Sequence, residues 1–294
     1  MKKLRILAAG VLAGCLALTA CGQSGSPGAS APVVSETAEA NVTVAGSPTF
    51  DAMKARDGVV IGVKDDQPGL GFKDATTGQY SGFDIEIARL VAAKLGFGAD
   101  KITYKTVPSA AREDTIARGE VDYYVGTYTI NDNRKKLVSF AGPYFVAGQS
   151  LLVRADDTTI TGKDTLKGKK VCSVTGSTPI QRVREQGLTD QIVEFQTYTQ
   201  CVDQLLSNQV DAVTTDDAIL KGYAAQQPDK LKVVGETFSQ EPYGIGLNKD
   251  DAALRNKIND ILQASYDDGT WQKIYDETLG KSGSPASPPA LQRY

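Results

Sequence analysis

Short apolar runs alternate with amphipathic stretches over most of the chain, which is the pattern of an α/β protein. The run at 59–64 is apolar until its last residue and predicts a buried strand. Apolar residues spaced by three and four at 83–95 predict a helix. Further strands are predicted at 102–107 and 121–128, with a short helix at 112–118 between them. This alternation favours a largely parallel sheet.

The same alternation continues in a second unit. Strands are predicted at 149–153, 170–174, 192–195, 210–215, 231–234 and 243–248, and helices at 180–186, 201–207, 219–226, 254–267 and 270–278. We therefore expect two α/β lobes, each with a ligand-facing loop after a strand.

The beginning of the chain, residues 1–20, has the features of an export signal. Positive residues precede an apolar stretch at 6–18 that is too short to span a bilayer as a mature helix. The stretch ends in Leu-Thr-Ala-Cys, which resembles the lipobox of bacterial lipoproteins and implies lipidation at Cys21. The alternative is an ordinary secretory signal with a chance cysteine. We expect an exported protein that a lipid anchors to the outer face of the cytoplasmic membrane.

Two segments outside the expected lobes have the composition of linkers. Residues 21–47 are rich in glycine, serine and proline, and we expect a flexible tether there. Residues 281–294 are rich in proline and serine, and we expect a disordered tail.

Charge and composition exclude several classes of function. The formal net charge is −3, and removing the three positive charges of Lys2, Lys3 and Arg5 with a signal peptide brings it to −6. A mildly acidic chain without a basic stripe is a poor nucleic-acid binder. The chain has no histidine, which excludes histidine-based catalytic triads and zinc sites. We expect no metal and no cofactor.

The cysteines divide by position. Cys15 leaves with the signal and Cys21 is the expected lipid site, so Cys172 and Cys201 remain. An even pair in an exported protein predicts one disulfide between them, and the alternative is two free thiols. With no histidine to activate either sulfur, a catalytic thiolate is not expected.

The stretch 126–144 carries the first candidate binding chemistry. A polar turn at 131–133 precedes Arg134, and Thr129 lies five residues before it. The planar guanidinium of arginine can grip a carboxylate with two parallel hydrogen bonds. The alternative for a lone arginine is an ion pair on the surface.

A resemblance to a known family begins at 82–87, which read Gly-Phe-Asp-Ile-Glu-Ile before a helix. They resemble the bacterial extracellular solute-binding proteins of family 3, the receptors of polar amino-acid ABC importers. Three further matches follow in the family's order, at 129–144, 176–178 and 210–216. The resemblance covers roughly 59–279. It implies a two-lobed clamshell of the periplasmic-binding-protein type II kind, with a mostly parallel sheet flanked by helices in each lobe. Lobe 1 would take residues 48–144 and 243–280, lobe 2 would take 145–242, and two crossings of the chain would form a hinge between them.

The resemblance implies which residues bind the α-carboxylate of an amino acid. Arg134, Thr129 and the backbone of Thr127 would bind it from lobe 1. Ser177 and Thr178 would join from lobe 2, where hydroxyls and backbone N–H groups meet at the start of a helix.

The resemblance also implies the partner of the α-ammonium. Asp216 ends a predicted strand at the matching position, and Asp217 beside it is the alternative. The acids of the first match, Asp84 and Glu86, are expected to favour the dipole of their own helix rather than to contact a ligand.

The side-chain end of the ligand would be bound by further cations. Ser109 and Arg112 match a Ser-x-x-Arg of the acidic-amino-acid binders, and Lys64 stands where those binders place another cation. The alternatives are an Arg112 in solvent and a Lys64 outside the site. Phe72 is expected to line the aliphatic part of the ligand or to be a core aromatic residue.

The whole pattern is similar to the glutamate-binding lipoproteins of Gram-positive importers. It implies a monomeric binding protein, not an enzyme, that captures glutamate or aspartate and passes it to a membrane permease. Three alternatives remain open. They are a glutamine, asparagine or other polar amino-acid receptor, a dehydratase-type enzyme on the same fold, and a sensor module for a separate partner.

Overall fold

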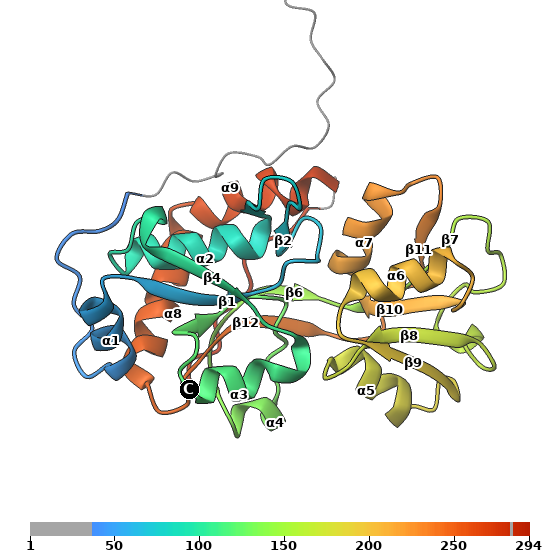
Figure 1. The fold of residues 1–294 in the computed structure, drawn as a ribbon, viewed down its shortest axis with the longest axis horizontal. Helices are drawn as coiled ribbons and strands as arrows, with labels where there is room; N and C mark the ends of the chain where they lie inside the picture. Colours follow the sequence, from blue (N-terminus) through green and yellow to red (C-terminus); the bar gives the residue numbers. More distant parts are fainter. Residues whose placement is uncertain (1–36, 283–284) are drawn as a thin grey trace, which may run out of the picture.

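A computed structural model describes residues 37–282 and 285–294, and Figure 1 shows two lobes side by side. Each lobe holds a five-stranded sheet with helices packed on its faces. The strand orders are β4-β1-β5-β12-β6 and β11-β7-β10-β8-β9. In the first sheet, β1 lies parallel to β4 and β5, as expected for strands joined through helices. The predicted two-lobed α/β fold is confirmed.

Lobe 1 combines an N-terminal portion with the last helices of the chain, so its sheet is completed by a strand that arrives late in the sequence. Its elements are α1 (Pro48–Arg56), β1 (Val59–Val63), β2 (Phe72–Lys73), β3 (Tyr80–Ser81), α2 (Phe83–Lys94), η1 (Ala99–Lys101), β4 (Ile102–Thr106), η2 (Ser109–Ala111), α3 (Arg112–Ala117), β5 (Tyr123–Tyr124), α4 (Asp132–Lys135), β6 (Ser139–Ala147), β12 (Glu241–Leu247), α8 (Ala252–Asp267), α9 (Thr270–Glu277) and η4 (Leu279–Ser282).

Lobe 2 is continuous in sequence. Its elements are β7 (Gln149–Arg154), η3 (Lys163–Thr165), β8 (Lys170–Val174), α5 (Thr178–Glu185), β9 (Gln191–Phe195), α6 (Tyr198–Leu206), β10 (Ala212–Asp216), α7 (Asp217–Gln226) and β11 (Leu231–Val234). Strand β8 lies parallel to both β9 and β10.

The lobes are joined by the neighbouring strands β6 and β12, which pair antiparallel (Figure 1). The pairing extends to Ala147 opposite Glu241, so both crossings begin where this two-stranded ribbon ends. The lobe boundaries expected after 144 and before 243 therefore fall inside the ribbon, a few residues too early in β6 and too late in β12. The strand pairing continues past the expected boundaries, so the hydrophobic pattern of the sequence does not change where one lobe ends and the other begins.

Aromatic rings fasten the first crossing to the core of lobe 1. Phe83 at the start of α2 contacts Tyr144 and Phe145 of β6 and also Trp271 of α9. The Trp271 indole N–H donates to the carbonyl of Tyr144 at 2.8 Å, and the indole is fully buried. Buried aromatic pairs of this kind add to the free energy of area burial. Strand β6 is thereby held rigidly on lobe 1 up to the crossing.

Both expected linkers are partly wrong. Residues 37–47 lie against lobe 1, where the Ser47 hydroxyl caps α1 and donates to Asp251 at 2.7 Å. Residues 285–294 also lie on lobe 1. The backbone N–H of Gln292 donates to the carbonyl of Gly142 at 2.8 Å. The N–H of Phe140 donates to the Tyr294 hydroxyl at 2.8 Å.

The reason is an unpaired strand edge, which composition does not reveal. Strand β6 is at the edge of its sheet, and its free N–H and C=O groups offer partners to any nearby extended chain. The expected signal peptide, the lipid site Cys21 and most of the tether lie outside the described residues. Within the described residues, no helix combines the length and the apolar composition that a membrane span requires.

The predicted disulfide is present. Cys172 of β8 and Cys201 of α6 are bonded, with their Cα atoms 5.6 Å apart, and both are fully buried. The bond fixes α6 against the sheet of lobe 2 near the N-terminal end of the helix.

We predict that replacing both cysteines, C172A together with C201A, lowers the free energy of unfolding by about 3–4 kcal/mol. The sequence separation is 29 residues, and a loop of that length gives about this loss of unfolded-state entropy. Alanine leaves no buried polar group behind. Urea unfolding of the double variant, with the oxidised parent as control, measures the loss, and a change under about 1 kcal/mol would contradict it.

Candidate ligand-binding site

A small cavity of about 10 Å³ lies between the lobes, close to the volume that one water molecule needs. The residues that line it are Ser109, Arg112, Thr127, Thr129 and Arg134 from lobe 1 and Ser177, Thr178, Pro179, Tyr198 and Asp216 from lobe 2. All of the expected ligand-contacting residues are in this lining except Lys64 and Phe72. An amino acid does not fit a space of this size, so a ligand can enter only if the lobes separate.

Arg134 is held in the cavity wall by a short helix that the sequence does not predict. The Asn131 side chain accepts from the backbone N–H of Arg134 at 2.9 Å and caps α4. The guanidinium donates to the carbonyl of Thr129 at 2.8 Å and, across the cleft, to that of Gly176 at 3.1 Å. Its Nε lies 3.3 Å from Glu113. Arg134 is only 7% exposed, which excludes the simple surface ion pair.

A second buried guanidinium lies beside the first. Arg112 is 2% exposed and stacks on the ring of Tyr128, with its Cζ 4.3 Å from the ring centroid. Its Nε donates to the carbonyl of Ser109 at 3.0 Å, and Nη2 donates to that of Gly176 at 3.3 Å. Among the described residues, these partners of Arg112 are backbone carbonyls and an aromatic ring, and none of them carries a negative charge. Burial, followed by the charge of Arg112, lowers the pKa of Arg134 to about 10.

Lys64 lies one layer behind the cavity. Its ammonium donates to the Ser109 hydroxyl at 2.9 Å and to the carbonyl of Val107 at 3.2 Å. Burial, followed by the charge of Arg112, lowers the pKa of Lys64 to about 7. Phe72 is half-buried in the small β2–β3 sheet, outside the cavity lining.

The backbone at Thr127 is held in a left-handed conformation, with φ at 46°. This turn ends the sheet pairing of β5 after Tyr124, although the apolar pattern predicts a strand up to residue 128. The N–H of Thr127 donates to the buried carboxylate of Asp84 at 2.9 Å, and Tyr144 donates to the same group at 2.8 Å. Burial raises the pKa of Asp84 to about 6.

Asp84 therefore does more than favour its own helix, which is what the sequence predicts for it. Helix α2 has no side-chain cap at its start, and the Asp84 carboxylate is directed to the neighbouring turn instead. Non-glycine residues with positive φ persist where their surroundings enforce that conformation, commonly at functional sites. Asp84 supplies one such constraint for the segment that carries Thr127 and Thr129.

Lobe 2 presents the start of helix α5 to the cavity. The Ser177 hydroxyl accepts from the N–H of Ile180 at 3.3 Å, and the helix begins at Thr178. The turn before it approaches lobe 1 very closely. A Cβ on Gly176 would lie 2.7 Å from the Cα of Ala110, and its φ is 78°, so both space and backbone conformation require glycine.

Asp216 supplies the negative charge of the cavity. It ends β10, is 3% exposed, and accepts from the Tyr243 hydroxyl at 2.7 Å through Oδ2. Its other oxygen has no hydrogen-bond partner among the described residues. Burial, followed by the charge of Glu241, raises the pKa of Asp216 to about 8. The competing Asp217 is outside the lining and pairs with Lys221 at 2.6 Å.

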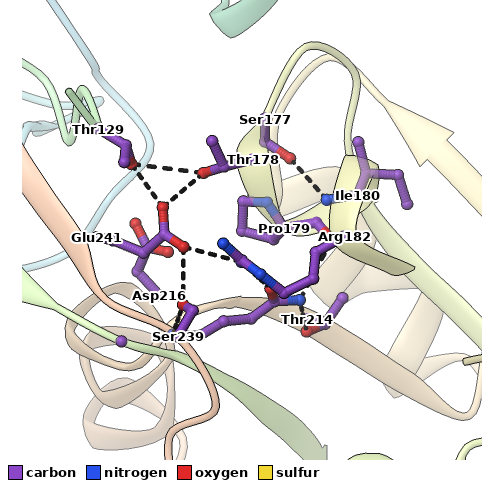
Figure 2. A network of polar contacts seen from close by, with 12 residues as sticks. Thr129, Ser177, Thr178, Pro179, Ile180, Arg182, Thr214, Asp216, Ser239 and Glu241 are labelled. Atoms are coloured by element: carbon purple, nitrogen blue, oxygen red, sulfur yellow. Dashed lines mark hydrogen bonds and ion pairs between the residues drawn. The ribbon is translucent and has the colours of Figure 1, made fainter. Parts of the chain in front are cut away.

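Three residues near the site are not found by the sequence analysis. Tyr198 and Pro179 line the cavity, and Glu241 accepts hydrogen bonds from two lining hydroxyls (Figure 2). A Thr-x-x-Gln capping box at Thr197 marks the start of α6, so the sequence could have placed Tyr198 at the first position of this helix. Nothing in the local sequence distinguishes Glu241 from an ordinary acidic residue at the start of a strand.

Two α/β lobes, a paired hinge ribbon and a cavity between the lobes lined by buried positive and negative groups together define a two-lobed receptor for a small polar solute. Residues 59–281 match the family model, and the chain belongs to the bacterial extracellular solute-binding proteins, family 3.

Similar proteins span nearly all of the chain. It is 40% identical over 286 residues to "Glutamate-binding protein GluB" of Corynebacterium glutamicum, covering 94% of this chain and 90% of that one. It is 37% identical over 279 residues to "ABC transporter glutamine-binding protein GlnH" of Bacillus subtilis, covering 95% and 98%. A solved ancestral arginine-binding protein, bound to arginine, shares 37% identity at a TM-score of 0.71, covering 76% of this chain and 98% of that one.

We predict that D216N raises the melting temperature of the ligand-free protein at pH 8, with a gain that shrinks toward pH 5. A raised carboxyl pKa means that the folded state binds a proton more tightly than the unfolded state. The stability of the parent therefore falls as the pH rises from about 4 toward about 8. Asparagine removes the buried charge. D217N is the matched control, and a gain of the same size at both pH values would contradict the prediction.

Proposed function

We propose that this protein is the amino-acid receptor of an ABC importer and that its ligand is an acidic amino acid, L-glutamate or L-aspartate. The observation that supports this most strongly is the charge of the cavity. In the cavity lining, two buried guanidinium groups, those of Arg112 and Arg134, stand against a single carboxylate, that of Asp216, while Glu113 contacts Arg134 from outside the lining. A ligand with two carboxylates and one ammonium supplies the missing negative charge.

The proposed arrangement gives each charged group of the ligand a partner. The α-carboxylate is bound by Arg134 and by the N-terminus of helix α5, where Ser177 and Thr178 lie. The α-ammonium is bound by the unpartnered oxygen of Asp216. The side-chain carboxylate is bound by Arg112.

Ser109 links this last contact to a further positive charge. Its hydroxyl lines the cavity and accepts from Lys64, which increases the positive potential at the Arg112 end. The position of Lys64 behind Ser109 gives it an indirect role in place of direct contact with the ligand.

A neutral side chain is the main alternative, because similar proteins are named for glutamine as well as for glutamate. An amide oxygen can accept from Arg112 but brings no negative charge. A buried cation without a counter-charge is strongly unfavourable. The arrangement therefore favours a carboxylate over an amide, and it disfavours a basic side chain beside Arg112 even more.

The capture mechanism follows from the division of the site between the lobes. With the lobes apart, the ligand meets Arg112, Arg134 and the Thr127–Thr129 segment, which lie on lobe 1. Closure about the β6–β12 ribbon then brings Asp216 and the start of α5 onto it, and the closed form delivers the ligand to the permease. A lipid at Cys21 keeps the receptor near the membrane, and a single chain is sufficient for the whole cycle.

We predict that R112M lowers the preference for glutamate over glutamine by at least about tenfold, because a charge-assisted hydrogen bond to the side-chain carboxylate is lost. R118M is the matched control, since Arg118 ends the same short helix and pairs with Glu120 in solvent. Calorimetric titration of each variant with both amino acids gives the ratio of the glutamine Kd to the glutamate Kd. An unchanged ratio in R112M would rule out an acidic ligand held by this residue.

We predict that R134A weakens binding of every amino acid that the parent binds, by about 100-fold or more, because it leaves the α-carboxylate without its cation. A thermal-shift screen across the twenty amino acids measures the loss, since a ligand of the folded state raises the melting temperature. Shifts as large as those of the parent would refute the site assignment.

A further inference from the structure

Glu241 is a fully buried carboxylate at the point where the second crossing enters the hinge ribbon. Its Oε2 accepts from the hydroxyl of Thr129 at 2.9 Å and from that of Thr178 at 2.8 Å (Figure 2). These two threonines come from opposite lobes. Its Oε1 accepts from the hydroxyl of Ser239 at 2.7 Å and forms an ion pair with the guanidinium of Arg182 at 2.8 Å. Both oxygens are fully occupied.

These contacts fix the direction of two hydroxyls that line the cavity. A threonine hydroxyl has one hydrogen to donate and two lone pairs that accept. Because Thr129 and Thr178 both donate to Glu241, only their lone pairs remain for a ligand. Their oxygens are 3.4 Å apart, a distance at which neither needs the hydrogen of the other.

The consequence is a patch of the cavity whose two hydroxyls can only accept hydrogen bonds and whose carboxylate accepts when it is ionised. It comprises the hydroxyl oxygens of Thr129 and Thr178 together with the free oxygen of Asp216. Such a patch attracts an ammonium and repels a carboxylate, which has no hydrogen to give at neutral pH.

We propose that Glu241 is a positioning residue that makes the cavity selective for ligands with a free α-ammonium. The inference rests on the proposed function as an amino-acid receptor and refines it. The side chains of Thr129 and Thr178 are assigned to the α-ammonium, although the sequence analysis expected them to bind the α-carboxylate. That carboxylate is left to Arg134 and to backbone N–H groups.

The ionised state of Glu241 is needed for this effect, and Arg182 compensates its charge. A glutamine at position 241 must direct its NH₂ group toward one pair of partners. Toward Arg182 the NH₂ would meet another donor, so the favourable orientation directs it toward the threonines. Their hydroxyls must then accept from the amide and turn their hydrogens toward the cavity. E241Q thus reverses the hydrogen-bonding direction of the patch while keeping its shape.

The test compares L-glutamate with glutarate, which has the same two carboxylates and no ammonium. Competition titration gives the ratio of the glutarate Kd to the glutamate Kd. We expect this ratio to fall at least about tenfold in E241Q, since one charge-assisted contact is weakened and a repulsion is relieved. E185Q is the matched control because Glu185 is an exposed acid of α5, and its ratio should equal that of the parent.

A purely structural role for Glu241 gives a different result. In that case both Kd values rise together and the ratio is unchanged, which overturns the inference. T178V provides a second measurement that does not depend on the folding of E241Q. It removes one of the two hydroxyls at constant shape, and it should lower the ratio as well. An unchanged ratio in T178V also overturns the inference.

Failure of the proposed function is recognised separately. If the parent binds glutamine instead of glutamate, the acidic-ligand proposal fails, and the ratio is measured with glutamine and its desamino counterpart. If the parent binds none of the twenty amino acids, the proposed function and this inference are both refuted.

Discussion

The antiparallel pairing of β6 with β12 is the constraint on which the site depends. The ribbon is fastened to lobe 1 by the buried rings of Phe83 and Trp271, and it ends where both crossings begin. Tyr243 and Glu241 lie on this ribbon and reach Asp216 and Thr178 of lobe 2. The hinge thus takes part in the polar contacts of the closed cleft and also sets the geometry of closure.

Much of the fold follows from the sequence because strand and helix periods are local properties. Arg134 and Asp216 are predicted to be site residues because each follows or ends an apolar strand within a recognisable motif, and both line the cavity. Partners distant in sequence are not accessible in this way. Thr129 and Glu241 are 112 residues apart, and their hydrogen bond exists only once β12 has paired beside β6 in the folded protein. The same limit explains the tail, whose contacts depend on the free edge of β6 and not on its own composition.

Lys64 and Asp84 show a related limit. The sequence places Lys64 near the ligand and Asp84 in its helix, and the structure gives each a supporting position behind a lining residue. Residue type and spacing predict that a charge lies in a region. They do not predict whether the charged group lines the cavity or lies one side-chain layer behind it and orients a lining residue, because side-chain packing decides that.

The closed cleft concentrates buried charges of both signs, the guanidinium groups of Arg112 and Arg134 from lobe 1 and the carboxylate of Asp216 from lobe 2. Burial, followed by the charge of Arg112, lowers the pKa values of Lys64 and Arg134, and burial, followed by the charge of Glu241, raises that of Asp216. Separation of the lobes returns water to these groups and relieves the free-energy costs of burying the positive charges and the negative charge. A ligand with complementary charges, once it has entered between the separated lobes, relieves them in a closed form wide enough to hold it. Under the proposed function, the same charges select the ligand and make closure depend on it, because a ligand stabilises the state in which its own charges are matched.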